Sequence, residues 1–368
     1  MIRDRLRAAY PVPVNPSRPA APADRPDRHG RVELLGARQR TLAGRTALVT
    51  GATGGVGLEI AIALARAGAR LILPARNPER ARQAAARIAQ AVPGLSGVGT
   101  GIDEGGPRGP VSAPAALRVI PLDLADLSTV AEAADILVRE GTPIDLLVAN
   151  AGIAALGDRG RRLTADGFER HFQTNYLGHA VLVSRLLPVL RLGSARLVLQ
   201  ISLATGGASV PFDDLQSEHG YSVMRAYRAS KVELGAFGVE LSRRSSRGGW
   251  GISVALAQPG VAMTGIAPTL QAAVGARAVG ALKHGLIRAR IAQDAADAAR
   301  PAVAAALAPT PVHPDAAHPV VSFAPAGPWR FAGPPVIVPV GPEMADPAVG
   351  ARLWEETRRF PGVELPLP

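Results

Sequence analysis

Tyr227 and Lys231 stand four positions apart in a segment, residues 226–244, that is predicted to be helical. On a helix, residues four apart lie on one face, one turn from each other. The chain has only two lysines among its 41 basic residues, so a compact ammonium group beside this phenol is expected to be required there. The pair is a candidate for acid–base chemistry. The alternative is two unrelated exposed residues, because Tyr-x-x-x-Lys arises readily by chance.

A glycine-rich turn follows a short buried strand predicted at residues 45–50. Residues 50–57 read Thr-Gly-Ala-Thr-Gly-Gly-Val-Gly, and the Ala- and Leu-rich stretch 58–67 continues as a helix. In dinucleotide folds such glycines permit the tight turn, admit a diphosphate to the backbone and let the helix pack closely on its strand. The free N–H groups of the helix N-terminus suit a pyrophosphate. An ordinary glycine-rich turn is the alternative.

Arg76 follows the second predicted strand, residues 70–73, within the sequence Pro-Ala-Arg-Asn-Pro. An acidic residue at this place, about 20 to 25 positions after the first glycine, would bind the ribose 2′-hydroxyl of NAD. An arginine there matches the 2′-phosphate of NADP instead, because a planar guanidinium group fits a phosphate. We therefore predict NADP, against the alternative of a surface arginine that caps a loop.

Strands and helices alternate along the rest of the chain. Further strands are predicted at residues 117–122, 144–149, 195–201, 252–258 and 336–340, and further helices at residues 79–92, 128–139, 164–190, 270–298, 301–308 and 346–359. The alternation predicts an α/β protein with a doubly wound Rossmann fold, in which a central parallel sheet has helices on both faces. Nearly every motif falls at the carboxyl end of a strand, where such folds bind ligands.

The composition divides the chain into an extension and one domain. Residues 1–40 hold nine arginines against four acidic residues, are rich in proline, and are expected to be disordered. Residues 41–368 are expected to form a single NADP-binding catalytic domain. It carries a Gly- and Pro-rich insertion at about 93–116 and a C-terminal region at about 262–345 that covers the substrate.

Several classes of function are disfavoured. The net charge of +11 is partly in the extension and otherwise scattered, without an aromatic-basic module, so no nucleic-acid partner is expected. No apolar run reaches the roughly 18 residues of a membrane span and no apolar signal segment opens the chain, so a cytoplasmic protein is expected. The absence of cysteine excludes disulfides and thiolate sites. The histidines show no metal-ligand spacing, so no metal is expected.

The motifs together resemble the short-chain dehydrogenase/reductase superfamily. That family has a similar Thr-Gly-x-x-x-Gly-x-Gly turn, Asn-Ala-Gly triplet, Tyr-x-x-x-Lys pair and Pro-Gly turn. The matching residues are 50–57, 150–152, 227–231 and 259–260. Residues 212–216 and the terminal helix resemble its long-loop members, which are related to retinol dehydrogenases. The resemblance covers about residues 42–367. Ala149 and Gln258 depart from it, since relatives often have Asn and His at these places.

The resemblance implies a catalytic set. Tyr227 would be the general acid in carbonyl reduction or the base in alcohol oxidation, and Lys231 would lower the pKa of its phenol. Ser202 would donate to the substrate oxygen, and Asn175 would hold a water in the proton relay. Asp123 would lie against the adenine, with a helix cap as the alternative. The implied cofactor-binding residues are Thr50, Gly51, Thr53, Gly54, Gly55, Val56, Gly57, Arg76, Asp123, Leu124, Asn150, Ala151, Gly152, Tyr227, Lys231, Pro259, Gly260, Val261 and Thr264.

The implied activity is hydride transfer between NADP(H) and a carbonyl or an alcohol. An NADPH-dependent C=C reductase of the protochlorophyllide reductase type is one alternative, and a non-catalytic NADP-sensing regulator is another. A homo-oligomer is compatible with all three. The substrate is expected to be mostly apolar, because the covering segments are apolar, although an inward-facing Arg225 or Arg277 would favour an acid. The apolar residues concerned are Val210, Phe212, Met263, Ile266, Leu270, Val274 and Val279.

Overall fold

The computed structural model describes residues 41–95, 98–100, 116–155, 157, 160–262, 287, 292–308 and 320–366. The basic extension, most of the insertion and much of the predicted substrate-covering region lie outside these residues. So do the predicted cofactor ligand Thr264 and the substrate-facing residues Met263, Ile266, Leu270, Val274, Arg277 and Val279. The proposed division of the chain therefore stays a prediction.

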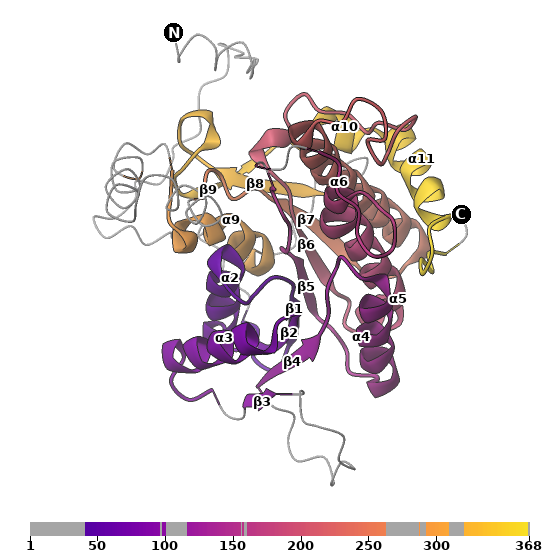
Figure 1. Cartoon of the computed structure of the whole chain (residues 1–368). Coiled ribbons are helices and arrows are strands. Elements are labelled where there is room, and N and C mark those ends of the chain that lie inside the picture. Colours follow the sequence, from indigo (N-terminus) through magenta and orange to yellow (C-terminus); the bar gives the residue numbers. More distant parts are fainter. Residues whose placement is uncertain are drawn as a thin grey trace.

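A twisted sheet forms the centre of the described part of the chain (Figure 1). Its strand order is β3-β4-β2-β1-β5-β6-β7-β8-β9, and every pairing is parallel except that of β9 with β8. The strands are β1 (Thr46–Val49), β2 (Arg70–Ala75), β3 (Val98–Thr100), β4 (Leu117–Pro121), β5 (Leu146–Ala149), β6 (Arg196–Gln200), β7 (Ser253–Ala257), β8 (Val321–Pro325) and β9 (Pro335–Val338). The predicted doubly wound α/β fold is confirmed.

Helices cover both faces of the sheet, with α2, α3 and α9 on one side and α4, α5 and α6 on the other (Figure 1). The last two helices, α10 and α11, pack against α6. The helices are α2 (Gly55–Arg66), α3 (Pro78–Ala91), α4 (Leu127–Glu140), η1 (Phe172–Leu177), α5 (Gly178–Leu192), η2 (Leu203–Thr205), α6 (Val223–Gly248), α9 (Ala295–Leu307), η3 (Pro328–Arg330), α10 (Pro342–Ala345) and α11 (Pro347–Arg358).

The central strands are buried on both faces because helices cover both. All residues of β1, β5 and β6 are buried, and side chains of β1 contribute to the apolar core on each side of the sheet. This is the pattern expected of a parallel sheet. Local signals fix the ends of the helices. Asn77 caps α3 by accepting the amide hydrogen of Arg80 at 2.9 Å, and Gly141 ends α4 in the left-handed conformation.

The structure differs from the predicted helices and strands in three respects. Residues 164–168 form a turn closed by a bridge between Leu163 and Glu169, so the helix predicted from residue 164 starts later. It opens with the π-helix η1, which propensity does not distinguish from an α-helix. The predicted break between two helices at residues 298–301 does not exist, because Pro301 lies inside α9. β3 and β8 were not predicted, since both are short and stand in Gly- and Pro-rich sequence.

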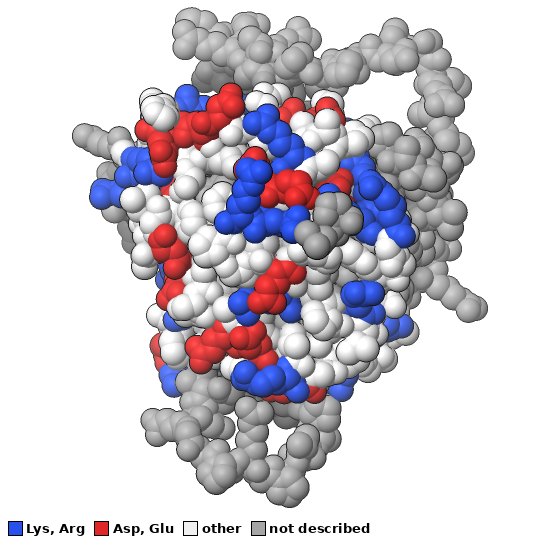
Figure 2. Space-filling view, turned by 90° about the vertical axis from the view of Figure 1, so that its right-hand side faces the viewer, with Lys and Arg blue, Asp and Glu red and all other residues white. Residues whose placement is uncertain are grey.

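Charged side chains are interspersed on the face that carries α4, α5 and α11. Figure 2 shows blue and red groups alternating there without a large field of one sign. Many are ion pairs along one helix, such as Arg358 with Glu355 at 2.8 Å and Arg359 with Glu356 at 2.9 Å. The positive net charge is therefore not gathered on this face.

Trp354 fastens α11 to the domain, and its removal should cost stability. It is fully buried, stacks on Phe237 at 5.6 Å and lies under the Arg244 guanidinium group at 4.6 Å. Trp354→Ala should lower the free energy of unfolding by about 3 to 5 kcal/mol, because a large cavity replaces the indole. Trp329, which is 43% exposed, provides the control, and Trp329→Ala should cost about 0.5 kcal/mol or less. Urea unfolding measures both, and equal losses would contradict the assignment.

Candidate active site

The glycine turn, the Asn-Ala-Gly triplet and Ser202 lie at the carboxyl ends of β1, β5 and β6. The chain runs from β1 to β2 on one side and later returns to β5 on the other side of β1. The loops after β1 and β5 therefore diverge, and this is the switch point at which doubly wound folds bind ligands. Arg76, Asp123 and the Pro-Gly turn stand instead at the carboxyl ends of β2, β4 and β7, further along the same edge of the sheet.

The glycine turn is built as predicted from its sequence. Gly51 and Gly55 adopt φ of +69° and +54°, which side chains rarely allow. A Cβ on Gly57 would come within 2.3 Å of the Gly51 carbonyl oxygen, so only glycine lets α2 pack this closely on the turn. Gly54 borders open space and caps α2 without a side-chain hydrogen bond. Backbone N–H groups at the start of α2 are thus placed where an anion could approach.

Thr50 joins the two strands of the switch point. Its hydroxyl oxygen accepts the amide hydrogens of Asn150 and Ala151, each at 3.0 Å. The side-chain amide of Asn150 donates to the Thr50 carbonyl oxygen at 2.9 Å. Asn150 thus links the two strands structurally.

His179 completes this tie, and its part was not predicted from the sequence. Its Nδ1 lies 3.2 Å from the Asn175 carbonyl oxygen, and its Nε2 lies 3.0 Å from the Thr50 hydroxyl. A carbonyl only accepts, so Nδ1 carries the proton and Nε2 accepts from Thr50. Burial and the charge of Lys231 lower the pKa of His179 to about 3, which keeps the ring neutral. The contact with Thr50 joins residues 129 positions apart, so spacing could not reveal it.

Arg76 ends beside Asp123. Its guanidinium Nη1 lies 3.7 Å from Asp123 Oδ2, and the Arg76 side chain is 68% exposed. Such a loose surface pair contributes little energy, so the guanidinium group stays available to a phosphate. Asp123 also accepts the amide hydrogen of Ala125 at 3.0 Å. The cap of α4 is Asp126, which accepts the Ser128 amide hydrogen at 3.0 Å, so the helix-cap alternative for Asp123 is wrong.

Tyr227, Ser202 and Lys231 form one cluster. Tyr227 and Ser202 are hydrogen-bonded through their side chains, although 25 residues separate them. Lys231 lies one turn further along α6, is 4% exposed, and donates from Nζ to the Gln200 carbonyl oxygen at 3.0 Å. The alternative of two unrelated exposed residues is therefore wrong for Tyr227 and Lys231.

Burial shapes the charges of this cluster. It lowers the pKa of Lys231 to about 8. It also raises the pKa of Tyr227, and the hydrogen bond with Ser202 only partly opposes the change. Both shifts have one cause, since a charged side chain loses hydration in the interior. At neutral pH the ligand-free site therefore holds a protonated phenol beside an ammonium group.

Asn175 lies in the π-helix η1 and is fully buried. Its Oδ1 accepts the amide hydrogen of Ile153 at 2.7 Å, and its Nδ2 donates to the Ile153 carbonyl oxygen and to Ser230 Oγ. Its side chain thus fixes the loop after β5. A Cβ on Gly152 would lie 2.9 Å from Lys231 Nζ and 3.0 Å from Asn175 Oδ1, so Asn175, Gly152 and Lys231 are close neighbours.

The turn Pro259-Gly260-Val261 follows β7 and lies against Phe331 and Gln293. Gly260 adopts φ of +69°, and the Val261 amide donates to the Phe331 carbonyl oxygen at 2.8 Å. The Val261 N–H is thus already paired within the protein. The expected binding of the cofactor by this turn stays a prediction.

Three acidic and basic side chains near the cluster were not singled out in the sequence. Glu169 and His171 form a buried pair at 2.9 Å. Glu233, on α6, is fully buried, and neither of its carboxyl oxygens has a hydrogen-bond partner. Burial, aided by the charge of Glu169, raises its pKa well above the ordinary value. No cluster suited to a metal occurs among the described residues.

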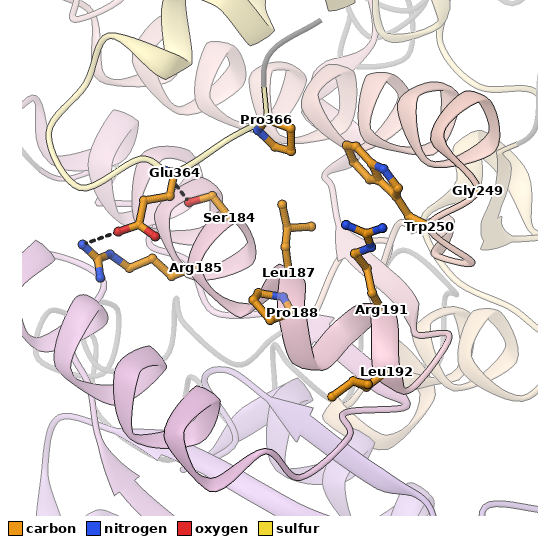
Figure 3. A pocket seen from close by; sticks show the side chains of 10 residues that line it. All are labelled: Ser184, Arg185, Leu187, Pro188, Arg191, Leu192, Gly249, Trp250, Glu364 and Pro366. Carbon is orange, nitrogen blue, oxygen red and sulfur yellow. Dashed lines mark hydrogen bonds and ion pairs between the residues drawn. The ribbon is translucent and has the colours of Figure 1, made fainter.

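A hollow of about 670 Å³ lies away from this cluster (Figure 3). It is bordered by the C-terminal ends of α5 and α6, which precede β6 and β7 and therefore mark the amino ends of these strands. Figure 3 shows Arg185 paired with Glu364 on one side and Arg191 near Trp250 on the other. The hollow shares no residue with the predicted site.

Comparisons with known proteins agree with this geometry. The model of the short chain dehydrogenase family matches residues 45–102 and 112–274. The chain belongs to this family of oxidoreductases. Human retinol dehydrogenase 14 is 34% identical over 224 residues, which cover 61% of this chain and 63% of that protein. Human retinol dehydrogenase 13 is 30% identical over 328 residues, which cover 89% of this chain and 87% of that protein.

The solved structures add support for the fold. An uncharacterised protein from Mycobacterium paratuberculosis has a TM-score of 0.64 and 27% identity, covering 89% of this chain and 97% of its own. The two retinol dehydrogenases confirm the expected relation at the level of family. None of the helices in the described ranges has the length and apolar character needed to cross a bilayer.

Glu233 should make stability depend on pH. The folded protein keeps a proton on this carboxyl that the unfolded chain releases above its ordinary pKa of 4.5. The contribution of Glu233 to the free energy of unfolding is therefore most favourable below that pH. It falls as the pH rises toward the folded-state pKa of this carboxyl. Glu233→Gln removes this loss, so its advantage over the wild type in urea unfolding should be larger at pH 8 than at pH 5.

The matched control is Glu240→Gln, which removes a buried carboxylate that is paired with Arg244 at 2.8 Å. This variant should be less stable than the wild type at both pH values, because it removes the buried carboxylate that Arg243 and Arg244 share. A Glu233→Gln variant that loses stability in the same way would contradict the assignment.

Proposed function

We propose that this protein is an NADP(H)-dependent oxidoreductase that transfers hydride between the nicotinamide and a carbonyl or alcohol carbon. The observation that carries the proposal is the cluster of Tyr227, Ser202 and Lys231 beside the glycine turn at the switch point of the sheet. The cofactor, when bound, supplies or accepts the hydride. The residues of the chain hold the reactants and move the proton.

The fit of a dinucleotide rests on the backbone around β1. The open side of Gly54 and the amides at the start of α2 suit a diphosphate, and Arg76 suits a 2′-phosphate. Gly152 lacks the Cβ that would crowd Lys231, so this backbone edge stays open to a ribose. Lys231 is the side chain proposed to reach the ribose hydroxyls.

Tyr227 is suited to act as a general acid. Its raised pKa keeps the phenol protonated in the free protein, ready to give its proton to the oxygen of a carbonyl as hydride reaches the carbon. Ser202 supplies a second hydroxyl near the same point, where negative charge develops on that oxygen. Two hydroxyls directed at one oxygen favour a carbonyl over an isolated C=C bond. Lys231 stabilises the phenolate left behind.

The substrate is proposed to be mostly apolar. Val210 is buried and Phe212 is half-buried on the loop before α6, in the segment expected to cover the reacting carbon. Phe212 lies under the guanidinium group of Arg352 at 4.2 Å. Arg225 is exposed and donates to the carbonyl oxygens of His219 and Gly220, which argues against a role for it as an inward-facing anion ligand. The cytoplasmic location and the lack of a nucleic-acid partner that the sequence predicts remain part of this proposal.

Tyr227→Phe should abolish proton transfer while leaving cofactor binding intact. The change removes only the hydroxyl, so NADPH affinity should stay near that of the wild type. The turnover of a carbonyl substrate should fall by roughly 10² or more. Steady-state NADPH oxidation and fluorescence titration of NADPH measure the two effects. A variant with more than about a tenth of wild-type turnover would assign the proton to another group.

Arg76→Ala should weaken NADPH and spare NADH. Loss of a hydrogen-bonded cation opposite a phosphate costs about 1.5 to 3 kcal/mol, and NADH has no 2′-phosphate to lose. Titration of both cofactors against both proteins measures the difference. Equal affinity of the wild type for NADPH and NADH would refute the cofactor assignment.

Apolar binding should appear as a dependence on chain length. In a series of straight-chain aldehydes, each buried methylene should add up to about 0.8 kcal/mol of transition-state binding, measured as kcat/KM. Short carboxylated carbonyl compounds serve as the comparison. A flat series, or a preference for the short acids, would overturn the apolar assignment.

A further inference from the structure

The Glu169 carboxylate is a junction of three segments around Tyr227. It is 1% exposed and accepts the Phe172 amide hydrogen at 2.7 Å. Its Oε1 also lies 2.9 Å from His171 Nδ1 and accepts the Tyr221 hydroxyl at 3.1 Å. Burial raises the pKa of this carboxyl, but the hydrogen bonds from His171 and Phe172 outweigh burial and hold it below the ordinary value. Glu169 is therefore an ionised acceptor for all three donors.

The first link runs through His171 to the loop after β5. His171 Nε2 accepts the Ala155 amide hydrogen at 3.2 Å, so the ring proton lies on Nδ1 and is donated to Glu169. The edge of this ring also packs on Tyr227, with ring centroids 6.2 Å apart and planes at 74°. His171 thus contacts both the loop that passes Lys231 and the ring of the proposed proton donor.

The second link runs to the loop that leads into α6. Tyr221 stands two residues before the first residue of that helix, and α6 carries Tyr227 and Lys231. The same loop is held again at Gln216, whose Oε1 accepts the Glu169 amide hydrogen at 3.1 Å and whose carbonyl oxygen accepts from Arg161 at 3.0 Å. Both the carboxylate and the backbone of Glu169 therefore hold this loop.

We propose that Glu169 is a positioning residue for the reaction, acting through His171 and Tyr221. It fixes the two loops that flank the Tyr227 phenol, so that the phenol meets the substrate oxygen in one geometry. The inference rests on the proposed oxidoreductase function. The glycine turn is held separately, by Thr50 and Asn150, so loss of Glu169 should disturb turnover and leave cofactor affinity unchanged.

The test compares Glu169→Gln, Tyr221→Phe and two variants of His171 in the full chain. Glu169→Gln should lower kcat for a carbonyl substrate by at least about 5-fold, since small misplacements of reacting groups are costly. Its NADPH dissociation constant should stay within about twofold of the wild type. Tyr221→Phe removes one hydroxyl and should also lower kcat. It provides the test if Glu169→Gln does not fold.

His171→Gln and His171→Asn form a matched pair. A glutamine reaches the position of Nε2 and can accept from Ala155, whereas an asparagine matches Nδ1 and cannot. His171→Gln should therefore retain more turnover than His171→Asn. Amide hydrogen exchange at Ala155 should quicken in His171→Asn and in Glu169→Gln, and this readout does not require turnover.

Glu240→Gln is the control, because Glu240 is equally buried and lies on α6 beyond Lys231. Equal losses of kcat in Glu240→Gln and Glu169→Gln would overturn the proposal, as would parallel losses of kcat and NADPH affinity in Glu169→Gln. A wild-type protein that binds NADPH but transfers no hydride would refute the proposed function instead. Unchanged exchange at Ala155 would refute the junction in either case.

Discussion

The pairing of β1 with both β2 and β5 is the constraint on which the rest of the site depends. It places the ends of β1 and β5 side by side. The Thr50 hydroxyl links these ends by accepting the amide hydrogens of Asn150 and Ala151, which directly follow β5. Only small residues fit there, since a Cβ on Gly51 would lie 2.9 Å from the Ala151 Cα. The glycine turn and the Asn-Ala-Gly triplet are thus two sides of one packing contact.

Helix α6 carries ionisable side chains that are buried in the interior beside these strands. Lys231 and Glu233 are both buried, and burial moves their pKa values in opposite directions because each loses hydration of its charged form. Lys231 gains a carbonyl partner, whereas the oxygens of Glu233 have none. Burial of these two groups therefore lowers the free energy of unfolding, as is expected near a functional site.

Local patterns predicted the parts of the site that lie close together in sequence. The glycine turn and the Tyr227 and Lys231 pair follow from spacing alone, because a turn and a helix are local structures. Ser202 could be joined to them through the resemblance and through the order of strand ends. The bond between His179 and Thr50 joins residues 129 positions apart, and nothing in the spacing indicates it.

The same limit explains the missed elements. The sequence of the π-helix η1 does not differ in composition from that of an α-helix. The importance of the Glu169 and His171 pair is visible only in the folded protein, where Ala155 and Tyr221 bind to it. β8 stands in Gly- and Pro-rich sequence without a local strand signal, and it forms by pairing with β7, which lies more than 60 residues earlier in the chain. Tertiary pairing, rather than local propensity, decides these features.

Transfer of deuterium tests the central claim most directly. NADPH labelled with deuterium at the transferable position of nicotinamide C4 would be incubated with the protein and an aldehyde, and the alcohol product analysed by mass spectrometry and NMR. The account predicts one deuterium on the carbinol carbon of the product, with none in a reaction that lacks the protein. An alcohol without deuterium at that carbon, or label found only on a reduced C=C bond, would contradict it.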